Sequence, residues 1–583
     1  MKMKKTTAQN RKKKQKNQRK KTESLLSFIR WRFRLSEILV AIAFIGLVAR
    51  ISYIEVIKPD RLLAEGNNRS LRIKSIASTR GIISDRNGQQ LAVSVPARAV
   101  IADPVTIFKN NGLQDLKPWY ALADVLGLDR ATLLNRIKKY KKKRFIYIQR
   151  QVRPVMADYI EKLKLPGISL KNESRRFYPS GEISSHIVGV TGIDGHGLEG
   201  IERTYDGWLT GEPGRKTVRK DRYGRVVENI ALKKRQPGKP LVLSIDQRIQ
   251  ATAYRAVKQA VMDNNAVSAS AILVDVKTGE ILAMVNAPSY NPNNRDQLQT
   301  YRMRNRAITD AIEPGSTVKP FVVLAALENK VVTPSTMVNT GNGVFRLGGR
   351  RVRDHRGLGK ISLTTILQKS SNVGVSKLSL AMPIQDLLGV YRSVGIGDYS
   401  GINLIGEASG FFPTRTRWSD FERATIAFGY GVAVTPIQLV HAYATLGAKG
   451  IRRPLSLLKT EKVVPGTQVV SKKNAVLVSN MLEAVVKRGG TATRAAVPGY
   501  RVGAKTGTSR VAIAGGYGND YEALTGGIAP LSDPRLALVV VVNEPKGSQY
   551  YGGLVASPVF SKIMTDALHL LNIAPDAPNE KDK

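Results

Sequence analysis

The distribution of apolar residues divides the chain into one run of membrane-crossing length and two longer regions with different patterns. Ile38–Ala49 is uncharged and almost wholly apolar. With its continuation to Ile57 it is about 20 residues long, enough to cross a ~30 Å hydrocarbon core. A buried core helix is the alternative for so short a strictly apolar run, whereas no small-x-small site follows it to favour a cleaved signal peptide. We predict a membrane helix over residues 36–57.

The region from residue 58 to residue 235 has a mixed and punctuated pattern. Residues 80–95 predict a strand, an Asn-Gly hairpin turn and a returning strand. Helical spacing covers Trp119–Ile137 and Ala157–Leu163. Nothing here has the pattern of a catalytic constellation, so we predict a mixed α+β supporting or partner-binding domain over 58–235. A linker rich in Pro and Gly follows at residues 236–240.

Beyond the linker, strand patterns stand at both ends of a long helical region. A sheet built from both ends of a domain, with helices inserted between, predicts an α/β or α+β sandwich with an antiparallel sheet plus an all-helical lobe. We assign residues 236–577 to this domain and residues 578–583 to a short C-terminal tail. The segments are a strand hairpin at 269–286, helices over roughly 316–490, an apolar strand at Arg535–Asn543 and a closing helix at Pro558–Leu571.

A formal charge of +46 changes the interpretation of the N-terminus. Residues 1–34 hold fourteen Lys and Arg and one acid, Glu23, a composition also typical of a disordered arm that binds nucleic acid. Because cytoplasmic flanks of membrane helices are enriched in Lys and Arg, the positive-inside rule explains the same charge. We therefore predict a basic cytoplasmic tail over residues 1–35, no nucleic-acid partner, and the bulk of the chain across the membrane.

Composition also removes several kinds of chemistry. The 583-residue chain has no cysteine, which excludes a disulfide framework, a thiol nucleophile and a cysteine-ligated zinc site. The histidines are scattered and none adjoins the motifs described next, so neither a Ser-His-Asp triad nor a His-Glu-x-x-His zinc site is supported. No metal or cofactor is predicted. The histidines are His186, His196, His355, His441 and His569.

Three short motifs in the C-terminal region carry the candidate chemistry. They are Ser316-Thr317-Val318-Lys319, Ser370-Ser371-Asn372 and Lys505-Thr506-Gly507-Thr508, spaced by 54 and then 135 residues. A Ser-x-x-Lys, a Ser-x-Asn type element and a Lys-Thr-Gly in this order are typical of serine acyl-transferases that bind penicillin. Each motif alone is weak. The ordered set predicts a serine nucleophile, a lysine base and an anion-binding strand.

Ser316 and Lys319 are the candidate nucleophile and base. Pro314 and Gly315 indicate a helix entry, and residues i and i+3 of a helix share one face within reach of each other. A serine hydroxyl needs a base to take its proton, and a lysine serves when burial or a nearby cation lowers its basicity. The helix N-terminus adds positive potential where an oxyanion forms.

Ser370 and Asn372 lie between two helical segments, a position that suits a loop facing a cleft. There Ser370 can relay a proton between Lys319 and a leaving or attacking amine, and Asn372 can hold a substrate amide. The alternative for such a Ser/Asn cluster is helix capping.

The third motif is predicted to end an apolar strand. Lys505, Thr506 and Thr508 can bind a carboxylate, and Gly507 lets a substrate approach the backbone closely. The backbone N–H groups of Ser316 and Thr508 are the predicted oxyanion hole. We expect the glycine-rich residues 509–522 that follow to form a loop.

Two further matches show why one motif is not enough. Ser456-Leu457-Leu458-Lys459 also fits Ser-x-x-Lys, but it follows Arg453-Pro454 without a Gly/Pro helix entry and is predicted to be a strand. Lys277-Thr278-Gly279 precedes the candidate serine and fits the turn of the hairpin at 269–286. Neither match is predicted to take part in catalysis.

Beyond the motifs, the chain closely resembles the division-specific class B penicillin-binding proteins of Gram-negative bacteria, the FtsI type. The likeness runs from the membrane segment to about residue 575. It implies a β-lactamase-like penicillin-binding/transpeptidase domain carried by a pedestal of the dimerisation type. The local blocks that carry it are 80–88, 173–181, 219–225, 275–291, 311–320, 418–425, 428–439 and 550–560.

The resemblance also implies a function, the cross-linking of septal peptidoglycan in cell division. Ser316 would attack the D-Ala–D-Ala bond of a stem peptide on a lipid-linked or nascent glycan strand and release the terminal D-Ala. This is chemistry of the serine-type D-Ala–D-Ala carboxypeptidase class. The acyl group would then pass to an amine on a neighbouring stem. Lys505, Thr506 and Thr508 would hold the terminal carboxylate, and a β-lactam would acylate Ser316 as a mimic.

The same resemblance implies a location and partners. The protein would be a single-pass protein of the cell inner membrane at the division septum, with a cytoplasmic N-terminus and a periplasmic catalytic domain. Its anchor would pair with an FtsW-type glycosyltransferase and other divisome proteins. An elongation-specific class B paralogue, and a catalytically idle divisome scaffold or β-lactam sensor, stay open as alternatives. The anchor and the large extra domain disfavour a β-lactamase.

Overall fold

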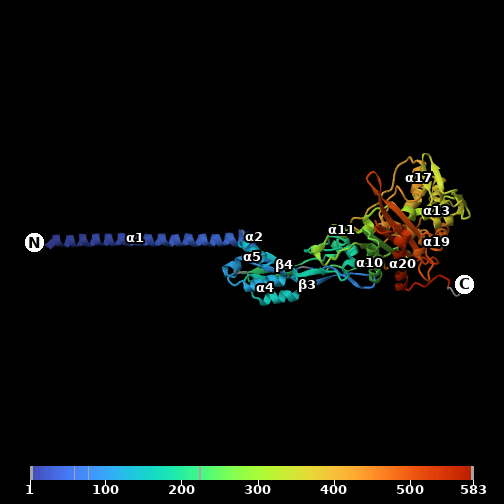
Figure 1. The fold of residues 1–583 in the computed structure, drawn as a ribbon. Helices are drawn as coiled ribbons and strands as arrows, with labels where there is room; N and C mark the ends of the chain where they lie inside the picture. Colours follow the sequence, from blue (N-terminus) through green and yellow to red (C-terminus); the bar gives the residue numbers. More distant parts are fainter. Residues whose placement is uncertain (1–3, 58, 77, 222–224, 579–583) are drawn as a thin grey trace. The chain divides into compact units, whose positions relative to one another are not determined.

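A computed structural model describes residues 4–57, 59–76, 78–221 and 225–578, and its chain divides into two compact units (Figure 1). The first unit comprises residues 1–77 and 213–235, and the second comprises residues 78–212 and 236–583. The second unit contains all three motifs. The domain boundaries expected at residues 36, 58, 236 and 578 stay a prediction.

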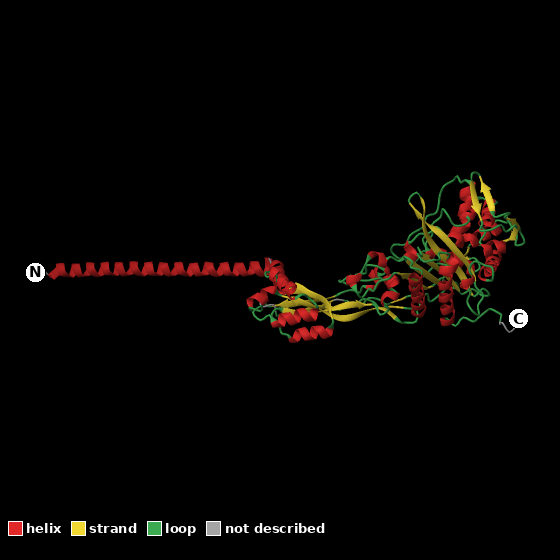
Figure 2. Ribbon diagram, viewed as in Figure 1, coloured by secondary structure: helices red, strands yellow, loops and turns green. Residues whose placement is uncertain are grey.

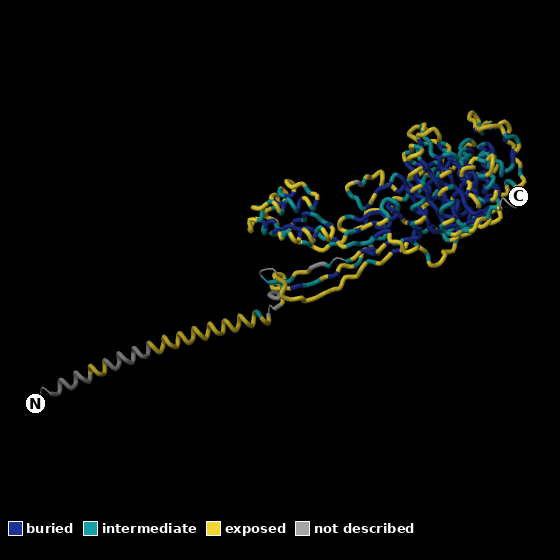
Figure 3. Tube along the Cα trace, turned by 60° about the horizontal axis from the view of Figure 1, so that its bottom comes forward, coloured by how far each residue is buried: buried dark blue, intermediate teal, exposed yellow. Residues whose placement is uncertain are grey.

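The first unit is dominated by one long helix, α1, which spans Lys4–Ser52 and continues as a π-helical turn at Tyr53–Ile57 (Figure 1). It is the one helix among the described residues that is long and apolar enough to cross a membrane, over Ile29–Val56. The side chains of this segment are exposed, Phe44 and Ile45 by 66% each (Figure 3). The segment predicted to cross a membrane is therefore helical, and the basic segment before it belongs to the same helix.

The rest of the first unit is a short helix and a small antiparallel sheet. Helix α2 spans Pro59–Ser70. The sheet has the strand order β1-β6-β7, with β1 at Leu71–Ile76, β6 at Gly214–Lys220 and β7 at Val226–Lys233.

The N-terminal part of the second unit is built around a second sheet, of order β4-β3-β2-β8, with β5 also paired to β3 (Figure 2). Its hairpin of β2 and β3 confirms the strands predicted over residues 80–95, although β3 continues to Ala102. The strands are β2 at Ile83–Ser84, β3 at Gln90–Ala102, β4 at Ile146–Val152, β5 at Ile168–Phe177 and β8 at Leu241–Val242.

The single helix expected over Trp119–Ile137 is wrong, because two helices occupy this segment. Gly127 ends the first in the left-handed conformation (φ +64°), and the Asp129 carboxylate caps the second by accepting from the Thr132 N–H. Both helices bury their apolar faces around Trp119. The helices of this part are α3 at Pro104–Lys109, α4 at Lys117–Leu126, α5 at Arg130–Lys139 and α6 at Pro154–Lys162, the last confirming the helix predicted at 157–163.

The linker predicted at residues 236–240 is tightly packed where Gly238 lies. The Gly238 N–H donates to the Thr79 carbonyl, and a Cβ atom on Gly238 would lie 1.8 Å from the Leu209 carbonyl oxygen.

Three short helices precede this linker in the sequence, α7 at Ser185–Val188, α8 at Gly200–Thr204 and α9 at Asp206–Leu209. From α8, Glu202 is fully buried and contacts two arginines, with 2.5 Å to Arg80 Nε and 2.7 Å to Arg176 Nε.

The C-terminal part of the second unit is organised on a five-stranded antiparallel sheet of order β10-β9-β19-β18-β17. Strand β19 is central, and residues 536–542 are buried on both faces, as expected for a continuous apolar run. The hairpin predicted over 269–286 is confirmed by β9 and β10. The strands are β9 at Ser268–Asp275, β10 at Ile281–Ala287, β17 at Gly503–Ile513, β18 at Gly516–Ala529 and β19 at Leu536–Asn543.

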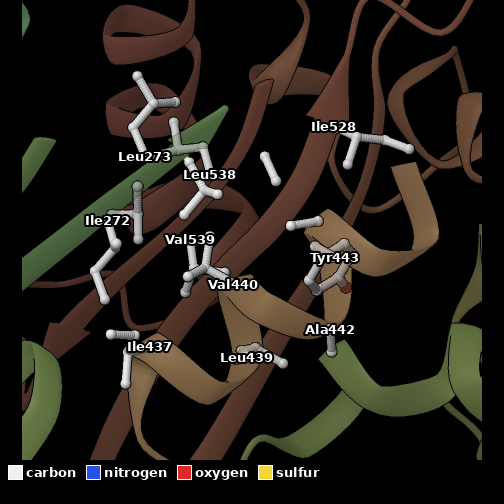
Figure 4. Packing of buried hydrophobic residues seen from close by; sticks show 14 of the residues in the cluster. Ile272, Leu273, Ile437, Leu439, Val440, Ala442, Tyr443, Ile528, Leu538 and Val539 are labelled. Atoms are coloured by element: carbon white, nitrogen blue, oxygen red, sulfur yellow. The ribbon is translucent and has the colours of Figure 1, made fainter. Parts of the chain in front are cut away.

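Helices cover both faces of this sheet. Successive residues of β18 show this directly, because a Cβ atom on Gly526 would meet the Tyr443 ring of α18, whereas the Thr525 hydroxyl lies 3.0 Å from that of Ser557 on α20. Helix α18 (Pro436–Gly447) thus packs on one face through residues such as Ile437 and Val440 (Figure 4). Helices α20 (Gly552–Leu570) and α10 (Gln247–Asp263) pack on the other.

Two predictions for this region are wrong. The segment 509–522, expected to be a loop, forms the ends of β17 and β18 and the turn between them. The closing helix begins at Gly552, so Pro558 lies inside it and not at its start. Alternating side chains of a strand edge are hard to separate from a polar loop by composition, and a proline is only a probable helix boundary.

The predicted helical lobe is present and also carries small two-stranded sheets. Its helices are α13 at Lys319–Glu328, α14 at Leu363–Lys369, α15 at Asn372–Leu380, α16 at Ile384–Ser393, α17 at Asp420–Ile426 and α19 at Lys472–Val486. The small sheets pair β11 (Met337–Asn339) with β14 (Lys360–Ser362), β12 (Val344–Leu347) with β13 (Arg350–Arg353), and β15 (Ile451–Arg452) with β16 (Thr467–Gln468). Short helices α11 (Thr300–Met303) and α12 (Arg306–Thr309) precede it.

Candidate active site

Ser316 lies on a tight 3₁₀ turn, Gly315–Val318, that leads directly into α13. Side-chain hydrogen bonds help to hold the turn: the Thr317 hydroxyl donates to the Pro314 carbonyl over 2.6 Å, and the buried Tyr443 hydroxyl donates to the Thr317 carbonyl over 2.8 Å. The predicted helix entry is therefore present, with Ser316 one turn before the α-helix proper. Its side chain is partly exposed at a cavity.

Gly507 provides the space for this turn. A Cβ atom at position 507 would lie 2.9 Å from the Pro314 carbonyl oxygen and 2.9 Å from the Thr317 methyl group. Because β17 passes so close to the turn, only a residue without a side chain fits there. The sequence predicted that Gly507 serves close approach of a substrate, whereas the close approach in the structure is made by the nucleophile's own turn.

Lys319 is completely buried and contacts the second motif. Its Nζ atom donates to Asn372 Oδ1 and to the Ser370 carbonyl, each over 2.6 Å, and lies 3.2 Å from Ser370 Oγ. The i, i+3 spacing predicts that Lys319 lies within reach of Ser316, and this stays a prediction. Within the described residues no hydrogen bond joins the two side chains, and Lys319 hydrogen-bonds to Ser370 and Asn372.

Lys505 is the second fully buried lysine of the site. From β17 its Nζ atom donates to Ser370 Oγ over 3.0 Å and to the Thr506 carbonyl over 3.0 Å. The Ser370 hydroxyl is thus the shared partner of both lysines. One continuous chain of hydrogen bonds runs from Lys319 through Ser370 to Lys505.

Burial changes the protonation of both lysines. Loss of hydration lowers the pKa of Lys319 well below its ordinary value, the positive charge of Lys505 lowers it further, and the carboxylate of Asp354 opposes the shift. Burial lowers the pKa of Lys505 to about 7. Two cations this close to one hydroxyl are unfavourable, so at neutral pH Lys319 is the one expected to be a neutral amine that can accept a proton.

The second motif occupies the junction between two helices. Ser370 ends α14 in the left-handed conformation (φ +57°), and the Ser371 hydroxyl caps α15 by accepting from the Gly374 N–H over 2.8 Å. Capping and facing the site are therefore not alternatives here. Ser371 caps the helix, while its neighbours Ser370 and Asn372 reach the lysines.

Asp354 holds this junction in place and was missed by the sequence reasoning. Its carboxylate accepts from the Asn372 N–H over 2.5 Å, the Val373 N–H over 3.0 Å and the Ser371 hydroxyl over 2.6 Å. Asp354 precedes the first residue of the motif by 16 residues, in a segment without hydrophobic periodicity. An isolated acid in such a segment gives no signal in a single sequence.

The third motif uses both faces of β17. Because strand residues alternate in direction, Lys505 and Gly507 face the helical lobe, whereas Thr506 and Thr508 face the opposite way. Thr506 Oγ1 donates to Thr491 Oγ1 over 3.0 Å, and Thr508 Oγ1 accepts from the Gly552 N–H over 3.0 Å. The motif lies inside a strand that continues to Ile513, not at a strand end as predicted.

A cavity of about 590 Å³ brings the three motifs together. It is lined by Ser316, Ser370, Asn372, Thr506, Gly507 and Thr508, with His355 and Lys369 at its rim. One wall is aromatic and was not predicted: the Tyr521 and Tyr550 rings stack at 4.2 Å, and Tyr551 stacks on Tyr550 at 4.5 Å. A larger cavity of about 890 Å³ lies between α10 and α20 and contains none of the motif residues.

The two further motif matches, Ser456–Lys459 and Lys277–Gly279 (the decoy motifs), do not line this cavity. The Ser456 hydroxyl donates to the Leu458 carbonyl and Lys459 Nζ to the Arg86 carbonyl, so neither contacts the site. Lys277 belongs to the β9–β10 turn and pairs with Asp533. No histidine adjoins the motifs in the sequence, but the fold brings His355 to the lining of the cavity. Within the described residues no hydrogen bond joins it to Ser316.

The described residues contain no group of three or more His, Asp or Glu side chains that could hold a metal ion. The chemistry available is that of a hydroxyl on a helix-entry turn, a buried amine, a hydroxyl shared by two lysines, and a strand whose edge lines a cavity. This combination of fold and site defines a serine acyl-transferase.

Comparison with known proteins identifies the family. The family model described as "Penicillin binding protein transpeptidase domain" matches residues 269–565, and "Penicillin-binding Protein dimerisation domain" matches residues 75–243. The chain is 50% identical over 567 residues to the "Peptidoglycan D,D-transpeptidase FtsI" of Escherichia coli strain K12, covering 97% of this chain and 96% of that one. It is 37% identical to the "Probable peptidoglycan D,D-transpeptidase PbpC" of Pseudomonas aeruginosa, covering 94% and 96%.

Solved structures agree. The transpeptidase domain of penicillin-binding protein 3 from Burkholderia pseudomallei has 39% identity and a TM-score of 0.54, covering 58% of this chain and 98% of that one. A peptidoglycan synthetase from Bifidobacterium adolescentis, at 24% identity, shares the fold with a TM-score of 0.69 over 87% of this chain and 98% of that one. The chain belongs to the penicillin-binding transpeptidase family, as a class B member of the FtsI type. With its apolar N-terminal helix, it is a single-pass membrane protein.

Proposed function

We propose that this protein is a septal peptidoglycan D,D-transpeptidase that works through an acyl-enzyme on Ser316 and is inhibited by β-lactams. Its FtsI-type family membership supports the reaction class and the peptidoglycan substrate. The observation that carries the assignment of residues is the hydrogen-bonded chain Lys319–Ser370–Lys505, which is buried beside the turn of Ser316. Such a chain can move a proton without admitting bulk water.

The first half-reaction forms the acyl-enzyme. Ser316 Oγ attacks the carbonyl carbon between the two terminal D-alanines of a stem peptide, and its proton passes to the neutral amine of Lys319. The N–H groups of Ser316 and Thr508 stabilise the oxyanion. When the C–N bond breaks, the leaving D-alanine takes up the proton through Ser370. A catalytic hydrogen bond between Ser316 and Lys319 that is absent without substrate can form in the complex.

The second half-reaction reverses these roles. The amine of a neighbouring stem peptide attacks the Ser316 ester, gives a proton to the Lys319–Ser370 pair and leaves as a cross-linked amide, while Ser316 regains its proton. Lys505, Thr506 and Thr508 bind the terminal carboxylate of the first substrate, and Asn372 holds an amide of its stem. Gly507 keeps the strand close enough to the turn for both groups to contact one substrate.

The remaining parts of the chain are assigned by the same family resemblance. We place the N-terminus and residues 1–35 in the cytoplasm, the membrane helix at 36–57, and the catalytic domain, residues 236–577, in the periplasm at the division septum. Residues 58–235 form the pedestal, and 578–583 the tail. The anchor pairs with an FtsW-type glycosyltransferase among other divisome proteins.

Labelling with a fluorescent penicillin tests the nucleophile. Wild type is expected to label, Ser316→Ala to lose all labelling, and Ser456→Ala, which changes the decoy motif, to label like wild type. Labelling of Ser316→Ala would overturn the assignment, and an unlabelled wild type would favour an idle scaffold. Depletion of the protein is expected to give filaments, whereas rounded cells would point to the elongation paralogue.

A further inference from the structure

A buried hydroxyl–carboxyl pair stands directly behind the nucleophile's turn. Ser509 and Glu522 are cross-strand neighbours in the β17–β18 register, so their side chains share one face of the sheet. Ser509 is completely buried and Glu522 partly. Ser509 Oγ lies 2.8 Å from the Glu313 carbonyl oxygen and 3.2 Å from Glu522 Oε2. The mechanism above uses neither residue.

The number of protons in this group restricts the form of Glu522. A serine hydroxyl has one proton to donate, and a backbone carbonyl can only accept. If Ser509 donates to the Glu313 carbonyl, its contact with Glu522 is a hydrogen bond only when Glu522 is the donor. Glu522 must then be a protonated carboxylic acid. An ionised Glu522 would instead accept the hydrogen bond from the Ser509 hydroxyl. The Glu313 carbonyl would then have no hydrogen bond from Ser509.

The surroundings favour the protonated form. Burial raises the pKa of Glu522 to about 8; the hydrogen bond with Ser509 opposes this shift, and the negative charges of Glu313, Asp310 and Glu544 add to it. The cations nearby are engaged elsewhere: Arg304 pairs with Asp310, and Lys546 pairs with Glu544. Among the described residues, no ion pair reaches Glu522 itself.

The Glu313 carbonyl connects this pair to the nucleophile. Glu313 precedes Pro314-Gly315-Ser316, and its own carboxylate accepts from the Gly431 N–H over 2.8 Å and the Tyr517 hydroxyl over 3.1 Å. Ser509 therefore fixes the backbone of the segment from which the turn begins. Ser509 directly follows Thr508, whose N–H is one proposed donor of the oxyanion hole. The hydrogen bond from Ser509 to the Glu313 carbonyl therefore links the strand of Thr508 to the segment that leads to Ser316.

We propose that Glu522, as a neutral carboxylic acid, is a positioning residue that directs the Ser509 hydroxyl to the Glu313 carbonyl and so holds the turn of Ser316 against β17. This inference rests on the proposed role of Ser316 as nucleophile. Ionisation of Glu522 at alkaline pH turns the Ser509 hydroxyl away and loosens the turn.

The test compares the full-length wild type with Glu522→Gln, Glu522→Ala and Ser509→Ala. The rate of acylation by fluorescent penicillin is measured between pH 6 and pH 9.5. A glutamine amide donates a hydrogen bond as the protonated acid does but does not ionise. Titration of Lys505 affects all variants alike, so the quantity that counts is the ratio of variant to wild-type rate. The exposed Glu461→Gln is the matched control for loss of one carboxylate.

We expect Glu522→Gln to acylate like wild type at pH 6 and several-fold faster at pH 9, and Glu522→Ala to be slow throughout. Ser509→Ala is also expected to acylate slowly. The ratio of its acylation rate to that of Glu522→Ala is expected not to change with pH. A Glu522→Gln to wild-type ratio that stays constant from pH 6 to pH 9.5 would overturn the proposal. So would a Glu522→Gln rate as low as that of Glu522→Ala at pH 6.

Thermal unfolding gives a readout that does not depend on the nucleophile. The folded-state pKa of Glu522 lies above its ordinary value of 4.5, so wild type is expected to lose stability relative to Glu522→Gln as pH rises from 4.5 to about 8, and no further above that. A stability difference independent of pH contradicts the protonated form of Glu522. If wild type fails to label with penicillin while this dependence is seen, the proposed function fails and the protonated carboxyl stands.

Discussion

The absence of a side chain at Gly507 makes the closest contact between the third motif and the nucleophile possible. Gly507→Ala places a methyl group 2.9 Å from the Pro314 carbonyl oxygen, so either the turn or the strand has to move. We expect a loss of about 1–3 kcal/mol in the free energy of unfolding, typical of overpacking, and a much slower acylation by penicillin.

Gly518→Ala on β18 is the matched control, since its Cβ atom would have no neighbour nearer than 3.4 Å. It is expected to behave like wild type in denaturant unfolding and in penicillin labelling. Wild-type acylation by Gly507→Ala would show that the close contact has no part in placing Ser316.

Lys505 gives a pH dependence of stability with a definite sign. Its folded-state pKa of about 7 lies below the ordinary value of 10.5, so between these values the folded protein binds fewer protons than the unfolded chain. Stability therefore rises with pH in this window, and Lys505→Met lacks the effect.

Thermal unfolding of wild type and Lys505→Met from pH 6 to pH 10 measures this pH dependence. The stability of wild type relative to Lys505→Met is expected to be lowest below pH 7 and to increase steadily above it. A difference that stays constant over this range would mean that Lys505 keeps its charge in the folded protein.

At the residue scale, the sequence predicted the groups of the site but not what supports them. The order and spacing of the motifs, together with the Gly/Pro helix entry that precedes only Ser316, were enough to select Ser316 over Ser456. Asp354 and Tyr443 could not be found in this way. Each acts through contacts formed only in the folded chain, Tyr443 with a carbonyl 126 residues away.

At the scale of elements, the contact of Arg80 and Arg176 with Glu202 joins the strand region of the pedestal to α8. Glu202 is fully buried and is the shared anion of the two guanidinium groups. Glu202→Gln leaves two buried cations with too little negative charge, and a loss of about 3–5 kcal/mol in the free energy of unfolding is expected.

Denaturant unfolding of the full chain checks this, with Asp124→Asn as control. Asp124 pairs with Arg130 over 2.8 Å, but both side chains are more than half exposed, so its replacement is expected to change stability little. Equal effects of the two substitutions would contradict the importance assigned to burial.

Elements with one clear periodicity were predicted well, and those with mixed signals were not. Strand β19 is apolar along its whole length and was recognised, as was the β9–β10 hairpin. The polar, glycine-rich composition of the end of β17 predicts a loop, whereas its pairing with β18 makes it a strand. The break at Gly127 was hidden because leucines on both sides continue the helical spacing.

At the scale of the whole molecule, the segment Ile29–Val56, formed by α1 and the π-helical turn after it, determines where the chain is located. Its apolar side chains are exposed, and the segment is long and apolar enough to cross a lipid bilayer. The full chain is expected to remain with membranes after an alkaline carbonate wash and to dissolve only in detergent.

A chain that begins at residue 58 is the comparison. It is expected to be recovered without detergent and still to react with penicillin, because the motifs lie in the other unit. Release of the full chain by the carbonate wash would contradict the membrane assignment.

The central claim is that Ser316 carries the acyl group of a stem peptide. The most direct measurement is to incubate the full-length protein, without an acceptor amine, with a stem peptide ending in D-Ala–D-Ala, quench it in acid and map the adduct by peptide mass spectrometry. The peptide containing Ser316 is predicted to gain the mass of the stem minus its terminal D-alanine, and Ser316→Ala to gain nothing. An adduct on another residue, or D-alanine release by Ser316→Ala at the wild-type rate, would contradict the account.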